Sequence, residues 1–323
     1  MKKFFRLKTL LTIFLILLVA AIAWMLRWRA VSNLPIDYDE DDYVRAGQQY
    51  AALIRAGDWA GFTQTNYRPE HPPLAKIIYG ISLLTTPEKP LLPDLSSSEG
   101  PNKYIPKSLL VAGRTTSALF GTLEALILAL VNPLAALFLS INTTTIKYTS
   151  QVMLEAVPAF TSLASILCYI RGRKKEGTGR RRGAMNAWLI SSAIFLGLTA
   201  VSKYIYCVVG IAILIDWFFV SREKEDLKHF FLEAGLWSLI ALAVFFATDP
   251  YLWPSPIERL KSSVLFSTAY STGTHVQEAG YPVWQPFVWF SRSVPWEGDQ
   301  AAFVVSLDTL ILILAIFGLP RLW

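Results

Sequence analysis

Residues 9–26 read TLLTIFLILLVAAIAWML and contain no charged side chain. A helix needs about 20 mostly apolar residues to cross a bilayer, so this run predicts a membrane span. The basic stretch MKKFFRLK precedes the run, and Arg27 and Arg29 follow it. A secretory signal peptide has a shorter apolar core and a small-residue cleavage site. We therefore expect an uncleaved anchor that enters the membrane from the cytoplasm.

The whole chain is apolar: 53% of its 323 residues are hydrophobic, 17% are charged, and the mean hydropathy is +0.40. Average soluble domains carry about 25% charged residues, so these values exclude a soluble two-domain enzyme and a disordered chain. The net charge of +6 is expected to set membrane orientation, and we expect no nucleic-acid partner. Cys168 and Cys207 lie inside apolar runs, where we expect small buried hydrophobic residues.

The other apolar runs predict an all-α polytopic membrane protein. With the first run they occupy about 9–26, 109–131, 133–148, 156–170, 185–203, 204–220, 231–247 and 301–319. The two most basic loops, 171–182 and 221–229, belong in the cytoplasm under the positive-inside rule. This orientation gives about eight transmembrane helices, a cytoplasmic N-terminus, and two large outer loops at 27–108 and 248–300. Residues 72–86 are short for a span, so we expect an interfacial or re-entrant helix there.

The first outer loop carries acidic residues at the start of a predicted helix. Apolar residues recur at helical spacing from Tyr43 to Ile54, and Gly57 is placed to end the helix. One acid suffices to cap a helix and to complement its dipole. Five acids stand here: Asp37, Asp39, Glu40, Asp41 and Asp42. Solvation, metal binding and catalysis remain open as explanations for the others.

The second half of this loop contains RPEHPPLAK at residues 68–76. Pro72 and Pro73 favour an extended entry followed by a helix start, because proline is tolerated in the first helical turn. This corner would hold His71 and Lys76 close to the membrane surface. A surface histidine without a function is the alternative for His71.

These motifs, in this order, resemble the GT-C class of membrane glycosyltransferases. Within that class they are most similar to the superfamily of protein O-mannosyltransferases and lipid A aminoarabinose transferases. The resemblance is carried by Asp39-Glu40-x-x-Tyr43, Gly57-Asp58-Trp59, His71-Pro72-Pro73-Leu74-x-Lys76, Ala112-Gly113-Arg114, Gln151-Val152-Met153-Leu154-Glu155, Gly197-Leu198-Thr199-x-x-x-Lys203-Tyr204 and Asp249-Pro250-Tyr251-Leu252-Trp253-Pro254. It implies a single GT-C-like module over 1–323. Relatives commonly continue further, so we expect a C-terminal truncation or a minimal form.

The resemblance implies an inverting glycosyltransferase that uses a polyprenyl- or dolichyl-phosphate sugar donor on the extracytoplasmic face. Asp39 matches the acid that deprotonates the acceptor, and Glu40 would orient it or help to hold a metal. The residues expected to bind the donor phosphate are His71, Lys76, Arg114, Lys203 and Tyr204, because fixed positive charge stabilises the leaving group. Glu155 matches a second acid of the family. No cofactor is firmly implied; a divalent cation would be held by Asp39, Glu40 and Glu155.

Other interpretations remain open from the sequence. A transporter or flippase tends to show internal repeats and polar residues at mid-membrane, and we find no convincing repeat. An inactive membrane scaffold would keep the fold without the chemistry. Arg114 and Lys203 could instead extend toward lipid headgroups. Asp249, at the head of the last outer loop, is a further candidate. No motif names the sugar, the acceptor (protein, lipid or glycan) or the membrane, whether a bacterial or archaeal plasma membrane or the endoplasmic reticulum.

Overall fold

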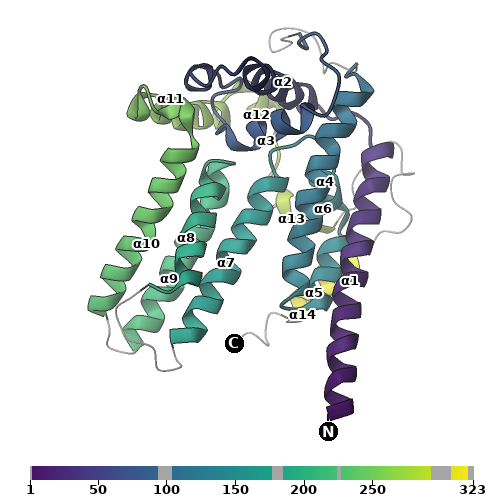
Figure 1. Cartoon of the computed structure of the whole chain (residues 1–323), viewed down its shortest axis with the longest axis vertical. Helices are drawn as coiled ribbons and strands as arrows, with labels where there is room; N and C mark the ends of the chain where they lie inside the picture. Colours follow the sequence, from purple (N-terminus) through teal and green to yellow (C-terminus); the bar gives the residue numbers. More distant parts are fainter. Residues whose placement is uncertain (1, 94–103, 177–184, 224–226, 292–306, 319–323) are drawn as a thin grey trace. The chain divides into compact units, whose positions relative to one another are not determined.

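The structure, a computed structural model, describes residues 2–93, 104–176, 185–223, 227–291 and 307–318. These residues form helices and no strand, which confirms the all-α class (Figure 1). The α-helices are α1 (Lys2–Asn33), α2 (Glu40–Ala56), α3 (Leu74–Leu83), α4 (Lys107–Ala129), α5 (Pro133–Ile141), α6 (Thr143–Tyr148), α7 (Ala156–Glu176), α8 (Ala187–Ala200), α9 (Val208–Glu223), α10 (Leu227–Thr248), α11 (Pro256–Ser271), α12 (Thr274–Ala279), α13 (Gln285–Ser291) and α14 (Asp308–Gly318). Three short 3-10 helices join them: η1 (Gly61–Thr63), η2 (Tyr204–Cys207) and η3 (Pro250–Leu252).

The chain divides into two compact units. Unit 1 comprises Met1–Val44, Thr85–Ala156 and Leu265–Trp323, and unit 2 comprises Arg45–Leu84 and Val157–Val264. Each unit therefore combines segments that are distant in the sequence.

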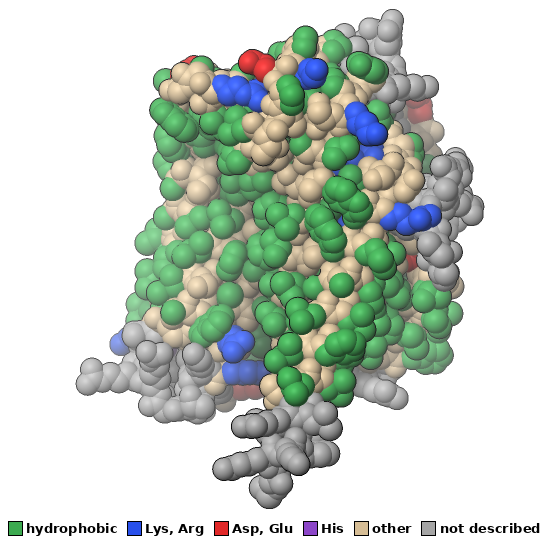
Figure 2. All heavy atoms as spheres, turned by 45° about the vertical axis from the view of Figure 1, so that its right-hand side comes forward, with side chains coloured by type: hydrophobic (Ala, Val, Ile, Leu, Met, Phe, Trp, Pro, Cys, Tyr) green, Lys and Arg blue, Asp and Glu red, His purple; other side chains and the backbone are tan. Residues whose placement is uncertain are grey.

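Three described helical segments are long and apolar enough to cross a membrane: Thr9–Asn33, Tyr204–Glu223 and Leu227–Thr248. Along α1, large hydrophobic side chains such as Leu10, Phe14 and Leu17 are exposed, as expected for a surface that faces lipid. Figure 2 shows the same property over the face that it presents, where hydrophobic side chains predominate. The chain is thus built as an integral membrane protein.

Other predicted spans take different forms. Helices α4 and α7 are of spanning length, with 23 and 21 residues, whereas α8 has 14. The predicted span over 301–319 lies partly outside the described residues, and its described part is the 11-residue α14. The count of about eight spans therefore stays a prediction.

The expectation of one continuous helix over 133–148 is wrong. Two short helices, α5 and α6, replace it, and the backbone at Asn142 is extended with φ −67° and ψ 122°. The Asn142 side chain accepts from the backbone N–H of Thr145 and so caps α6. Asp308, at the start of α14, accepts from the Thr143 backbone N–H at 2.9 Å and from its hydroxyl at 2.5 Å. The break is stable because side chains satisfy the freed backbone groups.

Unit 2 contains a helical bundle with an aromatic core. Trp217 and Trp237 are fully buried and meet edge to face, with ring centroids 6.4 Å apart. Gly197 of α8 lies against α10 so closely that an added Cβ would come within 2.6 Å of the Ala241 carbonyl. Cys168 is buried, Cys207 is half-buried, and both are free thiols, as expected.

The helix predicted from the acidic motif is confirmed as α2. Gly57 follows its last residue with φ +67°, a left-handed conformation that glycine adopts without strain. The predicted helix over 72–86 is the shorter α3. Gly47 and Gly80 allow these two helices to approach, because a Cβ on Gly80 would lie 2.7 Å from that of Tyr50.

Candidate functional site

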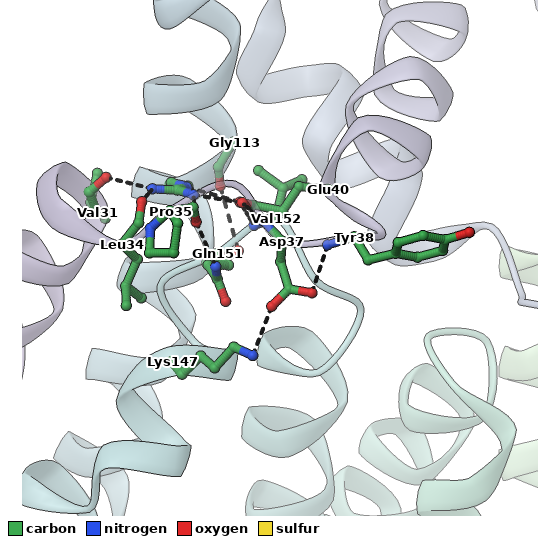
Figure 3. Close-up of polar contacts among 12 residues, drawn as sticks. Val31, Leu34, Pro35, Asp37, Tyr38, Glu40, Gly113, Lys147, Gln151 and Val152 are labelled. Carbon is green, nitrogen blue, oxygen red and sulfur yellow. Dashed lines mark hydrogen bonds and ion pairs between the residues drawn. The ribbon is translucent and has the colours of Figure 1, made fainter. Parts of the chain in front are cut away.

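Unit 1 contains a buried ion pair between Glu40, at the start of α2, and Arg114, in α4 (Figure 3). The Arg114 Nη2 and Glu40 Oε2 atoms are 2.5 Å apart, and Arg114 Nε donates to Oε1 at 2.9 Å. The two side chains, only 0–2% exposed, meet in a bidentate geometry. Such a planar arrangement suits guanidinium and is stronger than a single contact.

Arg114 uses all of its hydrogen-bond donors inside the protein. A guanidinium carries five N–H groups, and two of them bind Glu40. The other three donate to the backbone carbonyls of Val31, Leu34 and Pro35 at 3.0, 2.8 and 2.7 Å. The alternative that Arg114 extends toward lipid headgroups is therefore wrong. Its predicted role as a phosphate ligand is not tested, but that role would require at least one of these bonds to break.

Glu40 is saturated in the same way. Besides Arg114, its Oε1 accepts from the Val152 backbone N–H at 2.7 Å and its Oε2 accepts from the Asp37 backbone N–H at 3.0 Å. Each carboxylate oxygen thus has two donors, which fill its usual acceptor sites. Glu40 holds three segments together, namely the α1–α2 connection, α4 and residues 151–152.

Asp39 lies between two fixed neighbours. Glu40 is locked by Arg114, and Asp37 forms a 2.7 Å ion pair with Lys147 (Figure 3). The Asp39 carbonyl accepts from the Tyr43 backbone N–H at 3.2 Å, so Asp39 occupies the N-terminal end of α2. Asp39 is half-buried at this end of the helix.

Residues 149–155 complete the polar part of unit 1. Gln151 Nε2 donates to the Pro35 carbonyl at 3.0 Å, and Val152 packs on Gly113, where an added Cβ would meet its Cγ2 at 2.7 Å. Gly113 therefore permits the close approach that brings the Val152 N–H to Glu40. Glu155 is half-buried and immediately precedes α7.

The sequence names Asp39, Glu40 and Glu155 as ligands only for the case that a divalent cation is bound. Among the described residues no group of three or more His, Cys, Asp and Glu side chains could hold a metal ion. The four donors around Glu40 occupy both of its oxygens, and a divalent cation held by Asp39, Glu40 and Glu155 stays a conditional prediction.

Unit 2 contains a second buried cation, Lys76 of α3, which is 0% exposed. Its Nζ lies 2.7 Å from Asn66 Oδ1 and within 2.8 Å of three backbone carbonyls, those of Tyr67, Arg68 and His71. An ammonium has three N–H groups, so these four acceptors saturate it. Lys76 closes the loop that carries His71. Its predicted contact with the donor phosphate stays untested.

His71 is a neutral histidine beside positive charge. Burial, together with the charges of Lys76, Lys203 and Arg68, lowers its pKa to about 3. Arg68 has φ +58°, unusual for a side-chain-bearing residue, and its carbonyl accepts from the His71 N–H at 3.1 Å. His71 thus offers a neutral imidazole in an electropositive setting. Lys203 follows α8 in extended backbone, at the boundary between the predicted runs 185–203 and 204–220, and Tyr204 begins η2.

Asp249 and Arg259 are two further charged residues of unit 2. Asp249 is 1% exposed, and burial raises its pKa to about 6 although the backbone of Leu252 and the charge of Lys76 oppose the shift. Arg259 Nη1 donates to the carbonyls of Thr63 and Tyr251, and its guanidinium covers the Tyr251 ring at 4.2 Å. The sequence analysis missed Arg259, which lies outside every motif and is identified only by its contacts.

A family model described as dolichyl-phosphate-mannose-protein mannosyltransferase matches residues 62–253. The chain belongs to this family. The match includes His71, Lys76, Arg114, Glu155, Lys203, Tyr204 and Asp249, and it begins after Asp39 and Glu40. The resemblance stated from the motifs is thus confirmed at the level of the family.

Among solved structures, the S. cerevisiae protein O-mannosyltransferase Pmt1-Pmt2 complex bound to the sugar donor is similar, with a TM-score of 0.49 and 19% identity. The similarity covers 77% of this chain and 34% of that chain, so the chain spans about a third of that relative's length. A comparison with curated proteins finds no match.

Proposed function

We propose that the chain is a membrane glycosyltransferase that moves a sugar from a dolichyl- or polyprenyl-phosphate donor to an acceptor. Membership of the mannosyltransferase family is the observation that carries this proposal, and the family makes dolichyl phosphate mannose the first donor to test. The acceptor is a protein, lipid or glycan. The membrane helices of both units agree with a donor that is held by a lipid tail.

The proposed topology has about eight spans, a cytoplasmic N-terminus and the active site on the extracytoplasmic side. The basic sequence RGRKKEGTGRRR at 171–182 supports it through the positive-inside rule. Reporter fusions test it directly: we expect 171–182 in the cytoplasm and 87–108 outside. Finding both segments on the same side would contradict the topology.

Asp39 is the proposed general base. The acceptor hydroxyl attacks the sugar C1 carbon, the C1–O bond to phosphate breaks, the bonding electrons leave with the lipid phosphate, and the hydroxyl proton passes to the Asp39 carboxylate. A base must be ionised, and the N-terminal end of α2 favours that state. Glu40 has no vacant acceptor position in the structure, so we assign it to positioning Asp39.

The proposed donor-phosphate group is His71 with Lys203, in unit 2. Lys203 is half-buried, and its charge acts on His71, as does that of Arg68. A neutral imidazole can donate one N–H to a phosphate oxygen, while lysine supplies the fixed charge that a departing phosphate requires. Tyr204 adjoins Lys203 and stays a candidate, as does Glu155 as a second acid. Lys76 and Arg114 are assigned to positioning, since the protein itself saturates their donors.

The test uses the full chain in lipid nanodiscs with dolichyl phosphate mannose and a serine- and threonine-rich peptide, a lipid or a glycan as acceptor. Mass spectrometry should detect the added hexose, and Asp39→Asn should reduce transfer roughly 100-fold or more, the usual contribution of a general base. The matched control is Glu88→Gln, an exposed acid of the same unit. Full activity in Asp39→Asn would overturn the base assignment, and neither transfer nor donor binding by the natural chain would overturn the function.

A further inference from the structure

Asp249 has a feature that the packing of unit 2 does not explain. Its side chain is 1% exposed, yet its Oδ1 atom has no hydrogen-bond partner in the described part of the chain. Buried polar atoms nearly always have a partner, because burial without one destabilises the fold, and more so for a charged group. An orphan carboxylate oxygen inside a folded unit therefore indicates a missing donor.

The neighbouring donors are already used by other acceptors. The charges of Lys76 and Arg259 act on Asp249, but Lys76 Nζ is bonded to four other oxygens, and Arg259 is bonded to the carbonyls of Thr63 and Tyr251. The charge of Asp249 also acts on Tyr50 and Tyr204; the Tyr50 hydroxyl donates to the Thr65 carbonyl at 2.6 Å, and the Tyr204 hydroxyl is hydrogen-bonded with Ser263. The surroundings supply positive potential without a hydrogen bond to Oδ1.

The missing donor is best matched by a hydroxyl group. A divalent cation is disfavoured, because the described residues provide no group of three ligands. An added ammonium is disfavoured by the positive charges of Lys76, Arg259 and, around His71, Lys203 and Arg68. A neutral polyhydroxyl ligand avoids that repulsion, and its O–H groups are strong donors to a carboxylate.

We propose that Asp249 accepts hydrogen bonds from hydroxyl groups of the donor sugar, and that it thereby distinguishes sugar-loaded lipid phosphate from the bare lipid phosphate. This inference rests on the proposed function. Lys76 connects the two parts of unit 2 that the proposal uses, since its charge acts on both Asp249 and His71. In this proposal His71 and Lys203 bind the phosphate and Asp249 binds the sugar, so the two parts of unit 2 each recognise one half of the donor.

A buried carboxylate with an unpaired oxygen lowers the stability of the folded chain. Asparagine has the shape of aspartate without its charge, so Asp249→Asn should raise the melting temperature of the chain at pH 7.5. The same change should weaken sugar binding, because the carboxylate is a better acceptor than the amide. A purely structural acid would give the opposite result on stability, which makes this pair of readouts diagnostic.

The test measures equilibrium binding of dolichyl phosphate mannose and of dolichyl phosphate to the full chain in nanodiscs. We expect Asp249→Asn to lose roughly 10-fold or more in affinity for the sugar-bearing lipid, as for one charged hydrogen bond. Its affinity for dolichyl phosphate should change less than about 2-fold, which is well below that one bond. The matched control, Glu258→Gln, alters an exposed acid of the same unit and should change neither.

The outcomes separate this inference from the proposed function. If the natural chain binds both lipids and Asp249→Asn binds them as well as the natural chain does, the inference is overturned and the function stands. Equal weakening for both lipids, or a lowered melting temperature, shows a structural role and also overturns it. If the natural chain binds neither lipid, the proposed function and the inference fail together. A loss restricted to the sugar-bearing lipid supports the proposal.

Discussion

Two of the buried cations, Arg114 in unit 1 and Lys76 in unit 2, have different kinds of hydrogen-bond partners. Arg114 has a counter-ion and bonds to residues 74–83 positions away in the sequence. Lys76 donates to an amide oxygen and to three backbone carbonyls, which lie only 5–10 positions away in the sequence. One cation fixes distant segments of a unit against each other, and the other closes a local loop.

The difference follows from the shapes of the two groups. A guanidinium is planar and can bind a carboxylate with one edge and carbonyls with the others. An ammonium presents three donors around one atom, which suits a ring of carbonyl and amide oxygens. Both residues belong to motifs that predict phosphate binding, yet the N–H donors of both are hydrogen-bonded within the protein. A cation in a functional motif can therefore support the site without touching the substrate.

Removal of Arg114 should have the largest effect on stability. Arg114→Ala leaves Glu40 buried without its counter-ion, and breaking a buried pair in this way costs about 3–5 kcal/mol. Thermal unfolding in detergent should show a large drop in melting temperature. The double variant Glu40→Gln with Arg114→Met should recover part of it, because no uncompensated charge remains. A single variant as stable as the natural chain would show that the pair is not what joins α2 to α4.

Lys76→Met should have a smaller effect, about 2–3 kcal/mol, because the freed acceptors are neutral and close to the loop surface. We expect destabilisation together with faster proteolysis of residues 66–71, measured by limited digestion. Lys261→Met, which changes an exposed lysine of the same unit, is the control. A loop that stays protected in Lys76→Met would contradict the view that the ammonium closes it.

The packing that brings residues 151–152 to Glu40 can be tested at Gly113. Gly113→Ala forces its Cβ to within 2.7 Å of Val152, and overpacking of this kind costs about 1–3 kcal/mol. Gly235→Ala is the matched helix control, since nothing lies within 4 Å of its added Cβ. The control should be neutral or slightly stabilising. Equal melting temperatures for the two variants would show that the close approach of Val152 does not require a glycine at position 113.

His71→Gln should matter least for stability at neutral pH and more in acid. The pKa of His71 is lowered to about 3, so the unfolded chain takes up a proton below pH 6.5 while the folded protein does not. The stabilisation is complete above about pH 6.5 and is lost as the pH falls, by at most about 1.4 kcal/mol per unit. Melting temperatures from pH 7.5 to 4.5 should fall less steeply for His71→Gln than for the natural chain. Parallel curves would mean that His71 is protonated in the folded protein.

Much of the fold could be predicted from local patterns. The apolar run at 9–26, the spacing after Tyr43 and the glycine at position 57 predicted helices that the structure contains, because these signals act within a few turns of chain. The prediction of one continuous helix over 133–148 was wrong, because it rested only on the apolar composition of that segment. Asp308, over 160 residues away, caps the broken helix, and no local pattern records such a contact.

The apolar runs of the sequence were enough to predict an all-helical membrane protein, and the order of its motifs indicated the family. Hydrophobicity and short-range spacing are sufficient for both. Which charged side chains are fully bonded within the protein became visible in the three-dimensional structure alone. Arg114, Glu40 and Lys76 are saturated and Asp249 has an orphan oxygen, because hydrogen-bond saturation depends on atoms brought together from distant segments.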